Sequence, residues 1–130
     1  MAEQKSTTKR RKIKASSDQG RVYIQATFNN TVVSFTDASG NVLTWGSAGT
    51  AGFKGSRKST PYAATVSTQR AAEIAVQAGL KTVDVFVRGV GSGRDAAVRA
   101  LQNSGLSIST LKDLTPTPHN GVRAKKPRRV

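Results

Sequence analysis

The segment from residue 83 to residue 101, VDVFVRGVGSGRDAAVRAL, constrains the fold of this chain more than any other. A nearly continuous apolar run leads into a turn with three glycines, and a helical pattern follows. Such apolar runs are typical of strands in parallel sheets. Parallel strands need a crossover connection, which is usually a helix. The segment therefore predicts an α/β fold with crossover helices.

The rest of the core reads as three strands followed by alternating helices and strands. Residues 21–28 alternate strictly between polar and apolar, which predicts a half-buried strand. Its apolar side carries Val22, Ile24, Ala26 and Phe28. The seven predicted elements cover residues 21–28, 31–37, 41–46, 61–78, 81–87, 93–104 and 106–111. This order predicts a single small α/β domain with a mixed sheet, in a ribonuclease-H-like β-β-β-α-β-α-β topology.

Local signals mark the turns and the ends of the helices. Thr60 followed by Pro61 is an N-cap with proline at the first helical position. Ser92 with Asp95 resembles a capping box in which aspartate replaces glutamate. Asn29-Asn30 suits a tight turn, since asparagine tolerates positive φ. Small or apolar residues form one face of the first predicted helix: Ala64, Ala71, Ile74, Ala75 and Ala78.

The net charge of +14 indicates the class of partner. The chain holds 21 Lys+Arg against 7 Asp+Glu, and such an excess of one charge favours binding to nucleic acid or to an anionic membrane surface. No apolar run approaches the roughly 20 residues that span a bilayer. We expect no secretory signal in the basic N-terminus, which lacks an apolar segment. We therefore expect the partner to be a nucleic acid and not a membrane. The cytoplasm is the expected location.

Two basic arms flank the core. Residues 1–19 form an N-terminal arm, residues 20–114 the α/β core domain and residues 115–130 a C-terminal tail. Both arms are poor in apolar residues, so they are either solvated ends or segments that order on a phosphate backbone. Their charge favours the second interpretation. The cations expected to bind RNA are Lys9, Arg10, Arg11, Lys12, Lys14, Arg123, Lys125, Lys126, Arg128 and Arg129.

The glycine turn admits three interpretations. The stretch from Gly91 to Ala96 fits the dinucleotide fingerprint G-x-G-x-x-G/A, and Asp113 stands near where a ribose ligand is expected. A dinucleotide domain places this fingerprint after its first strand, whereas here it follows the fourth, so we expect no cofactor. The glycines could simply permit a tight turn. We favour a third interpretation, in which the helix N-terminus, Arg88 and Arg94 face a nucleic-acid phosphate.

Catalytic patterns are weak throughout the chain. Ribonuclease-H-type nucleases need several carboxylates around two Mg²⁺ ions, and the first strand supplies one of these carboxylates. In this chain the first predicted strand, residues 21–28, contains no acid. The acids of the core are scattered over Asp37, Glu73, Asp84, Asp95 and Asp113. The chain has no cysteine and a single histidine, His119, which has no motif pairing it with a nucleophile. We expect neither an enzyme nor a metal site.

The loop over residues 47–60, SAGTAGFKGSRKST, supports a phosphate-binding function. Glycines allow close backbone approach, while hydroxyls and cations suit phosphate oxygens. A structureless loop of this length in a small domain is usually functional, although it could also be a flexible surface loop. Trp45 and Phe53 either stack on exposed bases or belong to the core. The candidate contacts are Lys54, Gly55, Ser56, Arg57 and Lys58, together with Asn29 and Asn30 in the turn between the first two predicted strands.

Four long motifs suggest a family. They are YIQATFNNTVVSFTDASGNVLTW, GFKGSRKSTPYAA, VFVRGVGSGRDAAVRAL and DLTPTPHNGVRAKKPRRV. Together they closely resemble the bacterial members of the universal small-subunit ribosomal protein eleven family, over about residues 20–130. The basic N-terminal arm is not part of the resemblance.

The resemblance implies a structural function. Members of the family bind and bridge hairpins of 16S-type rRNA on the platform of the small subunit, near the messenger exit and the Shine–Dalgarno cleft. Small-subunit proteins seven and eighteen are usual neighbours, and initiation factor three binds close by. By similarity, residues 54–58 and the tail segment His119-Asn120-Gly121-Val122-Arg123 face rRNA. A generic basic RNA-binding module and a nucleotide- or metal-dependent enzyme are the alternatives.

Overall fold

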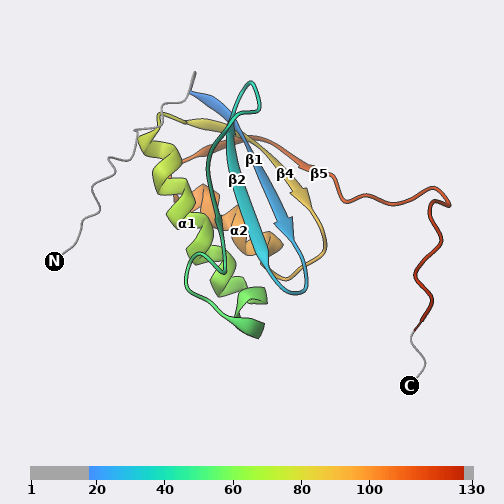
Figure 1. Ribbon diagram of the computed structural model, residues 1–130. Helices are drawn as coiled ribbons and strands as arrows, with labels where there is room; N and C mark the ends of the chain where they lie inside the picture. Colours follow the sequence, from blue (N-terminus) through green and yellow to red (C-terminus); the bar gives the residue numbers. More distant parts are fainter. Residues whose placement is uncertain (1–17, 128–130) are drawn as a thin grey trace.

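A computed structural model describes residues 18–127 of the chain. Five strands form one mixed sheet in the order β3-β2-β1-β4-β5, and two helices lie side by side on one of its faces (Figure 1). In chain order the elements are β1 (Gln19–Ala26), β2 (Thr31–Asp37), β3 (Val42–Ser47), the 3₁₀ helix η2 (Gly55–Ser59), α1 (Pro61–Gln77), β4 (Thr82–Arg88), α2 (Gly93–Asn103) and β5 (Ser107–Asp113). None of the helices in this described part is long and apolar enough to cross a membrane.

The sheet is built around β1. This strand pairs antiparallel with β2 on one side and parallel with β4 on the other. β3 continues the antiparallel half and β5 the parallel half. Helices α1 and α2 make the crossovers into β4 and β5, which is how parallel neighbours are normally connected. The predicted β-β-β-α-β-α-β order and its mixed sheet are confirmed.

The core lies between the helices and one face of the sheet. Val22, Ile24 and Ala26 are buried against it, as the alternation in β1 predicts. The small-residue face of α1 is confirmed at its alanines, which let the helix lie close to both the sheet and α2. Ile74 is the exception, because it is 45 % exposed on the outer side of the helix.

The first turn corrects two predictions. β1 ends at Ala26, so Phe28 does not continue its buried side and is 76 % exposed. The turn is closed by Thr27, whose hydroxyl accepts from the backbone N–H groups of Asn29 and Asn30 and donates to the Asn30 carbonyl. Neither asparagine has a positive φ. The hydrogen bonds of a threonine hydroxyl therefore close this turn, whereas the sequence suggested that asparagines with positive φ would close it.

The connection before α1 and the start of α2 also differ from prediction. Residues 47–60 are not structureless, because turns and η2 occupy most of the segment. Thr60 caps α1 as predicted, accepting from the Ala63 N–H at 3.2 Å. Ser92 makes no cap on α2, so the predicted capping box is wrong. Its hydroxyl donates instead to the Ser59 carbonyl and joins the two helix starts.

Close packing explains why the turn before α2 is rich in glycine. A Cβ at Gly91 would lie 2.2 Å from the Thr27 carbonyl oxygen, and one at Gly93 would lie 2.2 Å from Thr31 Oγ1 and 2.8 Å from Ala64 Cβ. Real Cβ atoms do not approach so closely. The glycines therefore let the turn lie directly against the end of β1 and the start of α1.

Gly93→Ala should lower the free energy of unfolding by about 1–3 kcal/mol, the usual cost of overpacking a tight site. Gly49→Ala is the matched control, because a Cβ there meets only ordinary contacts at 3.7 and 3.9 Å. Urea unfolding followed by circular dichroism gives both values. Equal stabilities for the two variants would contradict the packing explanation.

Candidate nucleic-acid interface

One end of the sheet gathers most of the core residues predicted to bind RNA. β1, β4 and β5 finish there, and β2, α1 and α2 begin there. The connections at this end are the turn 27–30, the loop 48–60 and the turn 89–92, which lie together at the lower end of the molecule in Figure 1. The Ser92 hydroxyl joins the turn 89–92 to the loop through the Ser59 carbonyl. Ala48 N donates to the Thr31 carbonyl and Gly91 N to the Ala26 carbonyl, the two strand residues that flank the turn 27–30. We call these three connections the carboxyl-end surface.

Two helix dipoles add positive potential to the carboxyl-end surface. The N-terminus of a helix carries about half a positive charge and favours anions nearby. No acid stands in the first turn of α1. The first turn of α2 holds Asp95, whose negative charge partly offsets the dipole of this helix. The start of α1 is therefore the more positive of the two.

The basic turn, residues 54–58, lies directly before α1. Lys54 and Arg57 are exposed and Lys58 is half-buried. Gly55 has a φ of 58°, in the left-handed region, which permits the chain to enter η2. The Thr60 hydroxyl donates to the Arg57 carbonyl at 2.8 Å and fixes the end of this short helix. The backbone thus presents its cations from an ordered turn.

An edge-to-face aromatic contact supports the loop. The rings of Phe53 and Tyr62 lie 5.7 Å apart at 82° to each other. Phe53 N also donates to the Ala48 carbonyl, which closes the loop on the end of β3. Phe53 is partly buried, so of the two alternatives for this residue the structure favours packing.

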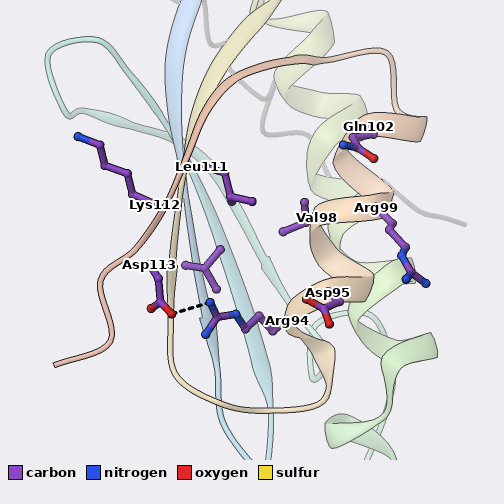
Figure 2. Close-up of a pocket in the computed structure, with 9 residues that line it drawn as sticks. Arg94, Asp95, Val98, Arg99, Gln102, Leu111, Lys112 and Asp113 are labelled. Atoms are coloured by element: carbon purple, nitrogen blue, oxygen red, sulfur yellow. Dashed lines mark hydrogen bonds and ion pairs between the residues drawn. The ribbon is translucent and has the colours of Figure 1, made fainter. Parts of the chain in front are cut away.

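The two arginines beside the glycine turn point to different sides of the sheet. Arg94 reaches from α2 to Asp113 at the end of β5, with Nη2 and Oδ2 2.6 Å apart (Figure 2). It also donates to the Gly89 carbonyl at 3.0 Å. Arg88 is exposed and pairs in register with Gln25, on the face that carries no helix. The predicted pairing of both arginines on one phosphate does not fit this arrangement.

Asp113 is held by its own chain. The Thr115 hydroxyl and backbone N–H donate to it, and Arg94 adds a charged hydrogen bond. The Thr115 hydrogen bonds first, and then Arg94, lower the pKa of this carboxyl from 3.8 to about 2. Asp113, the acid considered as a ribose ligand, therefore links α2, β5 and the start of the tail through these hydrogen bonds.

Two further acids, Asp84 and Asp37, lie apart and have local partners. Hydroxyl donors Ser109 and Thr110 lower the pKa of Asp84 in β4. The hydrogen bond from the backbone N–H of Asn41 lowers the pKa of Asp37, which closes the β2–β3 turn. Within residues 18–127, no three acids or histidines gather where they could hold a metal ion. The carboxylate arrangement of a two-metal nuclease does not occur in this part of the chain.

The tail begins at a fixed point and then leaves the body. Leu114 N donates to the Val87 carbonyl at 2.7 Å, and Gly89 N donates to the Thr115 hydroxyl at 3.1 Å. Beyond this junction the chain extends away from the sheet (Figure 1) and its side chains are exposed. These include the predicted contacts His119, Asn120, Gly121, Arg123, Lys125 and Lys126.

Some predicted contacts are used within the fold or fall outside the described part. Asn30 Oδ1 accepts from Thr31 N at 2.8 Å, whereas Asn29 is exposed. Ser56 lies in η2. Lys9, Arg10, Arg11, Lys12, Lys14, Arg128 and Arg129 lie outside the described residues. As RNA contacts, all of these residues remain predictions.

Sequence reasoning missed two candidates on the face without helices, Tyr23 and Phe86, which lie there beside Trp45, a residue already considered for base stacking. Tyr23 and Phe86 stack there with ring centroids 5.2 Å apart, and Trp45 is 58 % exposed. Tyr23 belonged to the polar side of the predicted strand and Phe86 to a strand read as buried on both faces. Only the pairing of β1 with β4 brings the two rings together.

Arg94→Ala should lower the midpoint of thermal unfolding, because the change removes hydrogen bonds that join α2 to the turn after β4 and to the end of β5. Arg88→Ala should leave the midpoint unchanged, since the Arg88 side chain is exposed. Differential scanning calorimetry distinguishes the two. Identical midpoints would contradict a stabilising function for Arg94.

The stabilisation from Asp113 should depend on acid pH. A carboxyl with a folded pKa lowered from 3.8 to about 2 stabilises the fold fully above its unfolded pKa, and this contribution is lost as pH falls toward 2. The midpoint of Asp113→Asn should lie below that of the wild type near pH 5, and the two should converge near pH 2. Glu73→Gln, which removes an exposed carboxyl from α1, controls for charge alone. A constant offset down to pH 2 would contradict the assignment.

The family comparison agrees with this geometry. The family model for ribosomal protein S11 matches residues 20–129, which is nearly the whole chain. The family is structural rather than enzymatic, and its members bind small-subunit rRNA and ribosomal proteins in the cytoplasmic ribosome. A glycine turn packed on β1, acids committed to local partners and exposed cations at two sites are what such a protein needs. The chain belongs to the ribosomal protein S11 family.

Proposed function

We propose that this protein binds and bridges rRNA helices on the platform of the small subunit, near the messenger exit and the Shine–Dalgarno cleft. It supports subunit assembly and translation from that position. Small-subunit proteins seven and eighteen are its neighbours, and initiation factor three binds close by. The N-terminal arm, residues 1–19, binds rRNA as a further basic segment.

The placement of two cationic segments on different elements of one body, one before α1 and one after β5, carries the proposal. The loop with the basic turn follows β3, and the tail follows β5, and these strands are the two edges of the sheet. The basic turn ends at Ser59, whose carbonyl accepts from the Ser92 hydroxyl before α2, whereas the tail leaves from the end of β5. The basic turn and the tail therefore reach two separate RNA segments at once. Because one rigid sheet joins the two sites, the protein holds two RNA segments in a fixed arrangement and so bridges them.

The recognition is directed at the RNA backbone. Cations, hydroxyls and helix N-termini contact phosphates and fix orientation without reading sequence. The carboxyl-end surface offers these groups from ordered turns. The tail offers cations from an extended segment, which folds onto RNA as it binds.

Protein neighbours have a separate place to bind. β5 is an edge strand with an exposed Leu111, and a cleft of about 460 Å³ lies between it and α2 (Figure 2). Val98 and Leu111 point into this cleft, whereas Lys112 points away from it (Figure 2). Apolar side chains beside an open strand edge, with Asp95 and Arg99 around them, suit a protein segment better than a phosphate backbone.

Deleting residues 116–130 should weaken binding to a platform rRNA fragment and reduce its salt dependence. The deletion removes Arg123, Lys125, Lys126, Arg128 and Arg129 but leaves the Thr115 junction intact. Loss of these cations should reduce the slope of log K against log salt by up to about 4. Filter binding over a series of salt concentrations measures this slope. An unchanged slope would show that the tail does not neutralise phosphates.

The triple variant Lys54→Ala/Arg57→Ala/Lys58→Ala should abolish bridging while leaving one RNA bound. Two labelled platform fragments, one held by the basic turn and one by the tail, should form a ternary complex with the wild type in a gel-shift assay, and only a binary complex with this variant. Arg70→Ala/Lys81→Ala/Arg99→Ala removes the same charge from exposed positions outside the carboxyl-end surface and should retain the ternary complex. If both triple variants behave alike, only net charge matters, and the protein is a generic RNA-binding module.

A further inference from the structure

The sheet has one face that no helix of the described chain covers. Residues that pair directly across neighbouring strands share a face, so the register defines a row across this open face. From β3 to β5 the row reads Trp45, Ser34, Tyr23, Phe86 and Lys112. The opposite face is identified by Val33 and Val85, which are buried against the helices. Three of the five residues in the row are aromatic.

These aromatic rings are accessible. Trp45 is 58 % exposed and Tyr23 is 37 % exposed. Tyr23 and Phe86 stack with an interplanar angle of 17°, so their rings form a stepped platform. A hollow of about 540 Å³ lies over this part of the sheet, and Tyr23, Phe86, Gln25, Ser34 and Pro116 from the start of the tail are among the residues that line it. Its volume falls within the roughly 300–1,000 Å³ of ordinary ligand pockets.

The small Ser34 leaves a gap in the aromatic row. Trp45 and Tyr23 lie on strands separated by β2, so two strand spacings of about 4.8 Å place their backbones about 9.6 Å apart. A ring stacked between two others needs two centroid separations of about 4.5–7 Å each, which is about 9–14 Å. The gap therefore admits one flat ring between Trp45 and Tyr23.

The charge around the row favours a polyanion. Arg21 and Arg88 are exposed on the same face and flank Tyr23 along β1 and β4, and Lys112 ends the row. Asp84 also lies on this face, but it is occupied by the Ser109 and Thr110 hydroxyls. The basic residues 1–17 of the same chain are a poor occupant, because their cations would meet these cations.

We infer that the open face binds unpaired bases of a single-stranded RNA segment, which stack on Trp45, Tyr23 and Phe86 while Arg21, Arg88 and Lys112 neutralise their phosphates. Aromatic platforms within a basic groove bind single strands because every base has a π-face and the backbone follows the cations. A duplex cannot use this surface, since its bases are already stacked on one another. The inference rests on the RNA-binding function of the family but not on the platform location or on bridging.

Trp45 is the only tryptophan in the chain, so its fluorescence reports directly on the open face. Titrating the full-length protein with an eight-nucleotide oligoadenylate should quench this fluorescence saturably. A duplex RNA of equal length should bind through the basic segments without quenching. Absence of quenching by the single strand, or equal quenching by the duplex, would overturn the inference.

Variants separate stacking from charge. Trp45→Ala should weaken single-strand binding by about 5- to 150-fold, the range expected for one base–aromatic stack, with an unchanged salt slope and unchanged binding to duplex. Arg88→Ala should instead reduce the slope by about 0.7. Ile74→Ala, an exposed truncation on α1, should change neither. Since Trp45 is exposed, thermal unfolding should confirm that its variant folds; wild-type affinity in a folded Trp45→Ala protein would overturn the inference.

A crosslink in the assembled subunit identifies the occupant. With benzoylphenylalanine in place of Trp45, irradiation should produce an adduct to rRNA. An adduct to a neighbouring protein or to residues 1–17 of this chain would assign the open face to that occupant. The absence of any adduct would contradict the inference. If Trp45 proves irrelevant while the basic-turn and tail variants still lose binding, this inference fails and the proposed function stands.

Discussion

The close contact between the glycine turn and the end of β1 is the feature on which the rest of this structure depends. Gly91 and Gly93 bring backbone against residues 27 and 31 at distances that no side chain would allow. α2 therefore starts beside α1, and the Ser92 hydroxyl joins the two helix starts through the Ser59 carbonyl. A looser turn would separate the helices and leave the sheet face beneath them open, because their small residues bury area only at short range.

The same contact arranges the charges. Both helix N-termini arrive at one end of the sheet together with the basic turn. Asp95 stands in the first turn of α2. The second acid at this end, Asp113, is held by Thr115 and Arg94 and has its pKa lowered to about 2. Arg94 thus contributes to the interface by pairing with Asp113, which neutralises this carboxylate and fixes the start of the tail. Asp113 therefore does not compete for the cations that remain exposed on η2 and on the tail.

The two faces of the sheet have different physical tasks. One is apolar, covered by alanine-rich helices, and supplies the core. The other carries aromatic rings and cations in register and stays accessible along its row. A parallel strand such as β4 is normally covered on both faces, and the partial exposure of Phe86 departs from that rule. Such a departure is expected where a partner completes the burial.

The sequence by itself determined the element order, the cap at Thr60, the buried side of β1, the charged arms and the family, because each depends on local spacing or on motifs within one segment. Tertiary structure decided what those segments do to one another. Arg88 and Arg94 diverge to opposite faces, the motif glycines pack directly against protein atoms, and Phe28 lies outside the core. Trp45, Tyr23 and Phe86 form one row. Strand register and close contacts join residues far apart in the chain, so no local pattern contains them.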